Sequence, residues 1–249
     1  MAGVIVVTGS SRGIGAATAR LAAKQGYDVC VNYVRDAAAA EKVVDDVRAA
    51  GRRAVAVQAN VASEGEIERL FQTVDRELGR VTVLVNNAAV VGQSRRRVET
   101  LRAQAVNELL AANVTGAMIC AREAILRMST KHGGSGGAIV NVSSASSRIG
   151  APNLWVDYAA SKGAIDSFTI GLAQEIAAEG IRVNAVRPGL IDTDIHAATG
   201  MPDRVMRAEK MIPLKRAGMP EEVAESILWL ASPAASYVSG AILDVAGGR

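Results

Sequence analysis

Short runs of apolar, mostly β-branched residues alternate along the chain with longer segments whose apolar positions recur at helical spacing. The short runs predict strands, and the longer segments predict helices that begin and end near polar or glycine residues. Because neighbouring strands are separated by helices of about a dozen residues or more, the pattern predicts crossover connections and a parallel sheet. The predicted strands are 4–8, 29–33, 54–59, 81–86, 138–142, 181–186 and 242–245. The predicted helices are 13–25, 37–50, 64–78, 100–131, 157–179 and 220–231, with an irregular helical stretch at 193–210.

The strands are apolar at consecutive positions, which is typical of a sheet covered by helices on both faces. Ser63 and Glu66 have the spacing of a capping box before the helix at 64–78. No linker, repeat or low-complexity tract interrupts the pattern. We therefore expect an α/β fold, with one doubly wound domain over residues 1–249.

Composition narrows the classes of function. The 249 residues are 49% hydrophobic and 21% charged, which excludes disordered and collagen-like chains. The net charge of +3 and the eight aromatic residues argue against a nucleic-acid partner. The only cationic run, Arg95-Arg96-Arg97, is interpreted as a solvated loop.

Cysteine and histidine give no sign of a metal site. Cys30 and Cys120 lie among apolar residues, so we expect buried thiols. His132 and His196 lie in no ligand-spaced motif. The sequence opens without a basic leader, and we find no run of about 18 apolar residues. These features predict a cytoplasmic protein with no membrane partner.

A glycine-rich turn, residues 8–15, follows the first strand and opens the first helix. Gly9 permits a sharp turn, Gly13 permits close approach of a pyrophosphate, and Gly15 permits tight packing of the helix on the sheet. Free N–H groups and the positive end of the helix dipole then face the phosphates. The spacing lacks the Gly-Lys-Ser/Thr ending of a phosphate-hydrolysing P-loop. The turn therefore predicts a dinucleotide site on a Rossmann-type domain.

The end of the second strand bears on the choice of dinucleotide. Tyr33 stands where an NAD-specific site places an acidic residue. Arg35 and Arg12 could converge on a 2′-phosphate, or both could point into water. Asp36 keeps NAD possible. We predict NADP, with NAD as the alternative.

Tyr158 and Lys162 are spaced i,i+4 at the start of a predicted helix, so they share one face. A phenol has a pKa near 10, and a neighbouring ammonium lowers it toward neutral pH. The same spacing is common in surface pairs. Here it occurs together with a dinucleotide turn and a serine-rich strand end.

Taken together, these motifs resemble the short-chain dehydrogenase/reductase family over essentially the whole chain, with similarity to 3-oxoacyl-ACP reductases and glucose 1-dehydrogenases. The resemblance implies hydride transfer between a nicotinamide and a carbonyl or alcohol, and a homotetramer. The matching positions are 8–15, Asn86-Asn87-Ala88, Asn113, Val142-Ser143-Ser144, Tyr158, Lys162, Pro188-Gly189, Thr193 and 244–248.

The resemblance also implies roles for single residues. Tyr158 exchanges the proton with the substrate oxygen, Lys162 lowers the Tyr158 pKa and binds the nicotinamide ribose, and Ser144 hydrogen-bonds the same oxygen. Asn113 holds a water that connects Lys162 to solvent. The implied cofactor-binding residues are Gly9, Ser11, Arg12, Gly13, Ile14, Gly15, Tyr33, Arg35, Asn60, Val61, Asn86, Ala88, Tyr158, Lys162, Pro188, Gly189, Ile191 and Thr193.

Three positions depart from the family pattern. Ala89 replaces a usual glycine, and Asn60 replaces a frequent aspartate. The step from Ser144 to Tyr158 is one residue longer than usual, which leaves Ser143 as a second candidate for the catalytic serine.

The substrate end is less specified. Residues 190–212, with Ile191, Ile195, His196 and Met201, are expected to form a lid. Trp155 is a pocket wall or a core or interface residue. The substrate is a 3-oxoacyl thioester, a sugar or a small ketone, and the alternative function is a non-catalytic dinucleotide-binding regulatory or structural subunit. Four further residues are core or interface: Leu109, Leu110, Val114 and Met118.

Overall fold

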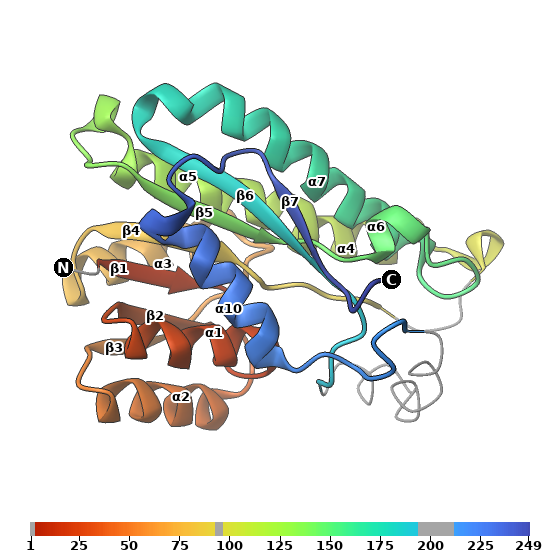
Figure 1. Ribbon diagram of the computed structural model, residues 1–249, viewed down its shortest axis with the longest axis horizontal. Helices are drawn as coiled ribbons and strands as arrows, with labels where there is room; N and C mark the ends of the chain where they lie inside the picture. The colour runs from red at the N-terminus through yellow and green to blue at the C-terminus, as the bar shows by residue number, and fades with distance from the viewer. Residues whose placement is uncertain (1–2, 93–96, 194–211) are drawn as a thin grey trace.

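A central parallel sheet organises the chain in the computed structural model, which describes residues 3–92, 97–193 and 212–249 (Figure 1). The strand order is β3-β2-β1-β4-β5-β6-β7, and every pairing is parallel. This confirms the predicted α/β fold with a doubly wound sheet. The strands are β1 (Val4–Val7), β2 (Asp28–Tyr33), β3 (Ala54–Gln58), β4 (Val81–Asn86), β5 (Gly137–Val142), β6 (Ile181–Pro188) and β7 (Ile242–Val245).

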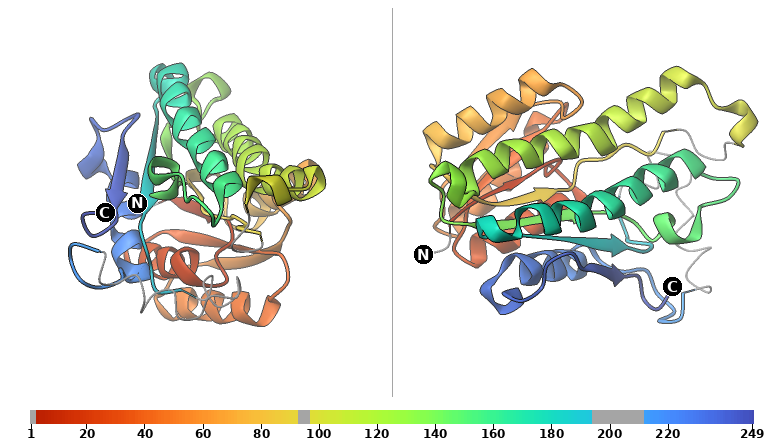
Figure 2. Two further views of the ribbon diagram at one scale, coloured as in Figure 1. Left: turned by 90° about the vertical axis from the view of Figure 1, so that its right-hand side faces the viewer. Right: turned by 90° about the horizontal axis from the view of Figure 1, so that it is seen from above.

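Helices cover both faces of the sheet. One layer holds α1, α2 and α10, and the other holds α3, α4, α5 and α7, with α4–α5 and α7 running side by side (Figure 2). The helices are α1 (Gly13–Lys24), α2 (Ala37–Ala49), α3 (Glu64–Glu77), α4 (Ala103–Leu110), α5 (Gly116–Met128), α6 (Ser146–Ile149), α7 (Val156–Ile176) and α10 (Pro220–Ala231). Short 3₁₀ turns lie at Val98–Thr100, Thr130–His132, Ala177–Glu179 and Pro233–Ala235.

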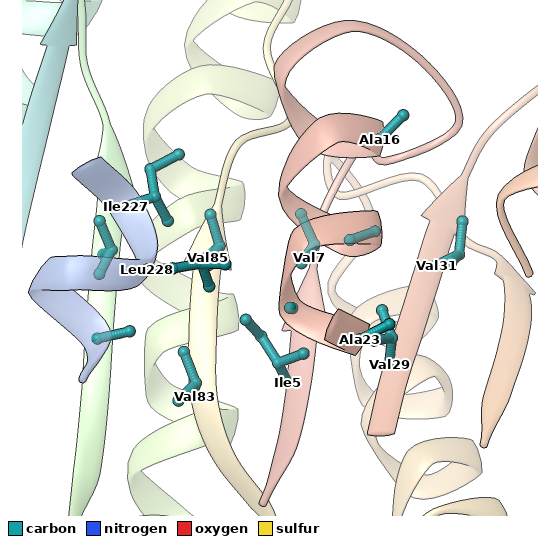
Figure 3. Close-up of a cluster of buried hydrophobic side chains, with 14 of the residues drawn as sticks. Ile5, Val7, Ala16, Ala23, Val29, Val31, Val83, Val85, Ile227 and Leu228 are labelled. Atoms are coloured by element: carbon teal, nitrogen blue, oxygen red, sulfur yellow. The ribbon is translucent and has the colours of Figure 1, made fainter. Parts of the chain in front are cut away.

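The first strand shows why both faces are apolar. Ile5 and Val7 point into a cluster beneath α1 and α10 (Figure 3), whereas Val4 and Val6 belong to a second cluster beneath α3, α5 and α7. All four side chains are buried. Alternate residues of a strand face opposite sides, so a strand between two helical layers must be apolar throughout.

The helix predicted at 100–131 is interrupted. Residues Ala111–Thr115 form a π-helical turn between α4 and α5, in which the Gly116 N–H donates to the carbonyl of Ala111. Ala103–Met128 is also long and apolar enough to cross a membrane, which corrects the expectation that no segment would be. Half of its most apolar window is buried inside the protein.

The capping box predicted before α3 does not form. Ser63 makes no side-chain cap hydrogen bond, and Glu66 instead accepts from the N–H of Asn60 at 2.8 Å. Asp36, by contrast, caps α2 by accepting from the N–H of Ala39 at 3.0 Å.

The sheet topology places the functional residues at one edge. Because all strands are parallel, their carboxyl ends meet on the same side, where α6 lies (Figure 1). The chain reverses its direction of winding between β1 and β4, the place where ligands bind in open α/β sheets.

Candidate active site

The glycine-rich turn needs glycine for two reasons. Gly9 and Gly13 have φ angles of +62° and +55°, a region that side chains disfavour. A Cβ on Gly9 would lie 2.9 Å from Ala88 Cα, and one on Gly15 would lie 2.6 Å from the Gly9 carbonyl oxygen. Among the described residues, a Cβ on Gly13 would meet only Thr193, at 3.5 Å. Gly9 and Gly15 therefore serve packing, and Gly13 leaves room above the turn.

Side chains from β2 and from the residues that directly follow β1 and β4 fix the shape of this turn. The Gly9 N–H donates to Asn32 Oδ1 at 3.0 Å, and Asn87 Nδ2 donates to the carbonyls of Thr8 and Gly9. Thr8 Oγ1 accepts from the N–H groups of Asn87 and Ala88 at 3.0 Å. The sequence alone indicates no role for Thr8, Asn32 or Asn87, although Thr8 and Asn87 lie within the matching motifs.

The start of α1 is suited to an anion. The N–H groups in the first turn of a helix have no acceptor within the helix. Arg12, at the N-cap, makes no side-chain cap hydrogen bond. Gly13 leaves the space above these donors open, so Gly13, Ile14 and Gly15 fit a pyrophosphate.

Arg12 lies in the glycine-rich turn, and Arg35 lies just after β2. Hydrogen bonds between Ser10 and Asn32 join these two segments. Both arginine side chains are exposed, and neither forms an ion pair within 3–92, 97–193 or 212–249. Tyr33 is half-buried against the core, and Asp36 is engaged as the cap of α2. This edge therefore presents two arginines that form no ion pair among the described residues, next to one exposed carboxylate, Asp36, which caps α2.

Asn60, Val61 and Asn86 line the neighbouring side of the site. Asn60 Oδ1 accepts from the Ala62 N–H at 3.0 Å, and the start of α5 packs on the Val61 carbonyl. Asn86 Nδ2 donates to Asn141 Oδ1 at 3.0 Å, while Asn86 Oδ1 is buried without a partner in the described part of the chain. A buried acceptor without a partner is unusual, so Asn86 Oδ1 is available to accept a hydrogen bond from a bound ligand. Val61, Asn86 and Ala88 border the same small depression.

Lys162 is a buried ionisable group whose surroundings shift its pKa. It is 3% exposed, and its Nζ donates to the Val142 carbonyl at 2.7 Å and lies 5.7 Å from the centre of the Tyr158 ring. Burial lowers its pKa to about 8, and the negative charge of Asp166 opposes that shift. A cation at this distance favours the ionised phenol.

The two candidate serines at the end of β5 differ in their surroundings. Ser143 is buried, and its Oγ donates to the Lys162 carbonyl at 3.2 Å. Ser144 is half-buried, and its Oγ accepts from the Ser146 N–H at 3.1 Å. That contact leaves the Ser144 hydroxyl proton for another acceptor, so its environment suits a substrate contact better.

Asn113 lies in the π-helical turn and is 2% exposed. Its amide exchanges two 2.8 Å hydrogen bonds with the backbone of Val90 and donates to Ser161 Oγ at 3.1 Å. Ser161 in turn donates to the Tyr158 carbonyl. Asn113 therefore connects the segment after β4 to the helix of Tyr158 and Lys162.

The segment after β6 returns to the same edge. The Pro188 carbonyl accepts from the Ala145 N–H at 2.9 Å, and the Gly189 N–H donates to the Val245 carbonyl at 3.0 Å. A Cβ on Gly189 would lie 2.8 Å from Ala246 Cα. Ile191 pairs with Gly218, and Thr193 approaches Gly13. Thr193 thus brings the segment after β6 close to the phosphate turn.

Other expectations have mixed outcomes. Cys30 and Cys120 are buried free thiols, as predicted. Trp155 is 4% exposed and packs with Tyr158, Val91, Ala151 and Ala159, so it belongs to a small core. Leu109 is buried, whereas Leu110 and Met118 are exposed and Val114 is half-buried.

Several predicted features fall outside the described residues. These are Arg95, Arg96, Ile195, His196, Met201 and most of the expected lid at 190–212. Within 3–92, 97–193 and 212–249, no group of three or more His, Cys, Asp or Glu residues could hold a metal ion.

The fold and these side chains define a dinucleotide-dependent oxidoreductase, and sequence comparison agrees. A family profile described as enoyl-(acyl carrier protein) reductase matches residues 9–249. The uncharacterized oxidoreductase YgfF of Escherichia coli is 50% identical over 246 residues, covering 99% of both chains. A 3-oxoacyl-[acyl-carrier-protein] reductase of Synechocystis is 40% identical over 252 residues, covering 98% of this chain and 96% of its own.

Structural comparison gives the same result. A metagenomic blue fluorescent protein crystallised with NADPH superposes with a TM-score of 0.89 at 33% identity, covering 99% of this chain and 97% of its own. The chain belongs to the short-chain dehydrogenase/reductase family. It is an oxidoreductase of that family.

Proposed function

We propose that the protein reduces a carbonyl group, or oxidises the corresponding secondary alcohol, with Tyr158, Lys162, Ser144 and Asn113 as its catalytic set. The observation that carries this proposal is the buried Lys162 ammonium, 5.7 Å from the centre of the Tyr158 ring. A regulator that only sensed a dinucleotide would need no proton donor and no buried cation beside it.

The bound nicotinamide supplies or accepts the hydride. Tyr158 donates its hydroxyl proton to the carbonyl oxygen during reduction and removes a proton from the alcohol during oxidation. Lys162 favours the phenolate form, which brings the Tyr158 pKa toward neutral pH. With three N–H donors and one held by Val142, Lys162 can also bind a ribose hydroxyl and a water.

Ser144 donates to the substrate oxygen, where negative charge develops in the transition state. Asn113 keeps the π-helical turn in place beside α7. Since its amide already bonds Val90 and Ser161, its backbone is the part that can hold the water beyond Lys162.

We also propose that NADP(H) is preferred over NAD(H). Arg12 and Arg35 are exposed, form no ion pair within the described residues and supply positive charge at the edge of the turn, while one carboxylate oxygen of Asp36 caps α2. Arginine suits the recognition of phosphate because its planar fork donates in parallel. Two solved relatives are complexes with NADP or NADPH.

The substrate is proposed to be a 3-oxoacyl thioester, a sugar or a small ketone. Thioesters come first, because a relative with 40% identity is named a 3-oxoacyl-[acyl-carrier-protein] reductase. The other residues that the family resemblance implies at the cofactor site, among them Ser11, Asn60, Val61, Ile191 and Thr193, belong to the same proposal.

The experiment follows NADPH absorbance with β-keto thioesters, diketones, keto sugars and aryl ketones, comparing wild type with Tyr158→Phe. We expect one carbonyl class to be reduced and the variant to lose about 10²- to 10⁴-fold in kcat while binding NADPH normally. Tight NADPH binding without turnover of any class would favour the regulatory alternative. Turnover that survives in Tyr158→Phe would contradict the mechanism.

We further propose a cytoplasmic homotetramer as the working form. Exposed apolar side chains lie on α4, α5 and α7 (Leu110, Met118, Leu126 and Ile170), and others lie near β7 (Trp229, Tyr237 and Leu243). Size-exclusion chromatography with light scattering tests the assembly, and a monomer at micromolar concentration would contradict it.

A further inference from the structure

The helix of Tyr158 carries a second buried ionisable residue that the mechanism above does not use. Asp166 lies one helical turn beyond Lys162 and is 7% exposed. Its Oδ2 accepts from Arg187 Nε at 3.0 Å and from an Arg187 terminal nitrogen at 2.8 Å. Its Oδ1 is buried and has no hydrogen-bond partner in the described part of the chain.

Arg187 connects this carboxylate to a longer series of alternating charges. It lies on β6, immediately before Pro188, and another of its terminal nitrogens is 3.8 Å from Asp244 Oδ1 on β7. Asp244 Oδ2 is 3.0 Å from Arg148 on α6, the short helix that follows Ser144. Arg187 is therefore shared between two carboxylates, one near Lys162 and one nearer the surface.

A buried ion pair is weak evidence for stability, because desolvation can cost more than the attraction returns. The arrangement is better explained by what Asp166 faces. Its charge acts on the Lys162 ammonium and partly offsets the cost of burying that cation. The side chain of Arg187 is only 20% exposed, so water screens its interaction with Asp166 weakly.

We propose that Asp166 is a positioning residue for the Tyr158–Lys162 pair, with its carboxylate stabilising the Lys162 ammonium and Arg187 setting how strongly it does so. The inference deepens the proposed function and rests on it, since it assigns Tyr158 as the proton donor. Neither Asp166 nor Arg187 touches substrate or cofactor in this account.

Other charged groups surround the same helix. Asp157 and Tyr158 share α7 with Lys162, Arg187 faces it from β6, and Arg148 approaches from α6. Asp244 lies behind Arg187 on β7. The Asp166 carboxylate lies one helical turn from Lys162, and its negative charge raises the Lys162 pKa against the effect of burial.

The two partners should shift the Tyr158 titration in opposite directions. In Asp166→Asn the Lys162 ammonium loses the negative charge one helical turn away and deprotonates at lower pH. Tyr158 then lacks a cationic neighbour, so its pKa rises. In Arg187→Gln the carboxylate loses its counter-ion, Lys162 stays charged to higher pH, and the Tyr158 pKa falls.

The experiment titrates the near-ultraviolet absorbance of the phenolate without cofactor or substrate. Each protein is compared with its own Tyr158→Phe version, so that the other tyrosines cancel. We expect Asp166→Asn to move the Tyr158 midpoint up, and Arg187→Gln to move it down, each by about half a unit to one unit. The pH profile of kcat should move in the same direction as each midpoint.

Glu175→Gln, which removes an exposed carboxylate from the same helix, serves as the matched control and should titrate like wild type. Asp166→Asn should fold, because its amide oxygen can still accept from Arg187 and Asp244 remains near that arginine. If it does not fold, Arg187→Gln alone decides by the sign of its shift.

Midpoints equal to wild type, or shifted the same way in both variants, would overturn the proposal and leave the pair with a purely structural role. The titration requires no turnover. A protein that reduces no carbonyl but shows the opposite shifts would therefore contradict the proposed activity while supporting this inference.

Discussion

The two ends of the site are built from different materials. At the phosphate end, glycines and backbone N–H groups form the surface, and the charged side chains, Arg12 and Arg35, stand exposed at its edge. At the chemical end, the decisive groups are buried side chains, above all Lys162 and Asp166. The phosphate end depends on the shape of the backbone, which a larger side chain at a glycine position would disturb. The second depends on charge held away from water, which a single isosteric substitution can change.

The largest effect is expected at the chemical end. Lys162→Met should lower kcat by about 10³-fold or more, because Tyr158 loses the cation that favours its phenolate. The same variant should be no less stable than wild type at pH 7, and more stable by about 1–3 kcal/mol, because a buried ammonium is costly. Thermal unfolding and steady-state kinetics of the same samples check both statements.

The pH dependence of this stability difference has a definite sign. The pKa of Lys162 is lowered from 10.5 to about 8 in the folded protein, so the unfolded chain binds its proton more tightly. The penalty is complete below about pH 8 and disappears as the pH rises toward 10.5. Wild type should therefore approach the variant in stability over that window. The exposed Lys24→Met serves as control, and a variant less stable than wild type at every pH would refute the explanation.

A smaller effect separates the two serines at the end of β5. Ser144→Ala should lower kcat about 10²-fold through loss of a hydrogen bond to the developing charge. Ser143→Ala should change kcat by only about twofold and instead lower stability by about 1 kcal/mol, because its hydroxyl bonds the Lys162 carbonyl. Kinetics and urea unfolding of both variants make the comparison. Equal kinetic losses would remove the distinction.

The smallest effect belongs to the phosphate end. Arg35→Ala should weaken NADPH binding about tenfold and leave NADH binding unchanged, since only the 2′-phosphate meets the lost charge. Calorimetric titration of both nucleotides measures this, with the exposed Lys42→Ala on α2 as control. Equal weakening of both nucleotides would show that Arg35 acts on the pyrophosphate or on the fold.

Features set by local sequence were predictable. The strand at 81–86 coincides with β4, because a continuous apolar run between polar residues has one solution in a covered sheet. The shared face of Tyr158 and Lys162 follows from helical spacing, and the turn at Gly9–Gly15 follows from the backbone freedom that those glycines provide.

Features set by partners far apart in the chain were not predictable. The π-helical turn exists where Asn113 bonds the backbone of Val90, 23 positions earlier, and nothing in Ala111–Thr115 indicates it. Ser63 and Glu66 do not form the predicted capping box, because the Glu66 carboxylate accepts from the N–H of Asn60 instead. Asp166 and Arg187 lie on different elements, so their pairing became visible only in three dimensions. Asp166 had one local signal, its place one turn after Lys162.

The central position of β1 has a consequence for synthesis. This strand pairs with β2 on one side and β4 on the other, although β4 begins at residue 81. During translation the unit β1–α1–β2–α2–β3 can close first, with the β4-facing edge of β1 unpaired and apolar until the next strand emerges from the ribosome. The glycine-rich turn is thus synthesised before some of the residues that fix its shape. Asn87 and Ala88, which hydrogen-bond the turn at Thr8 and Gly9, are synthesised only after β4. A nascent chain stalled before residue 81 should expose that edge to chaperones.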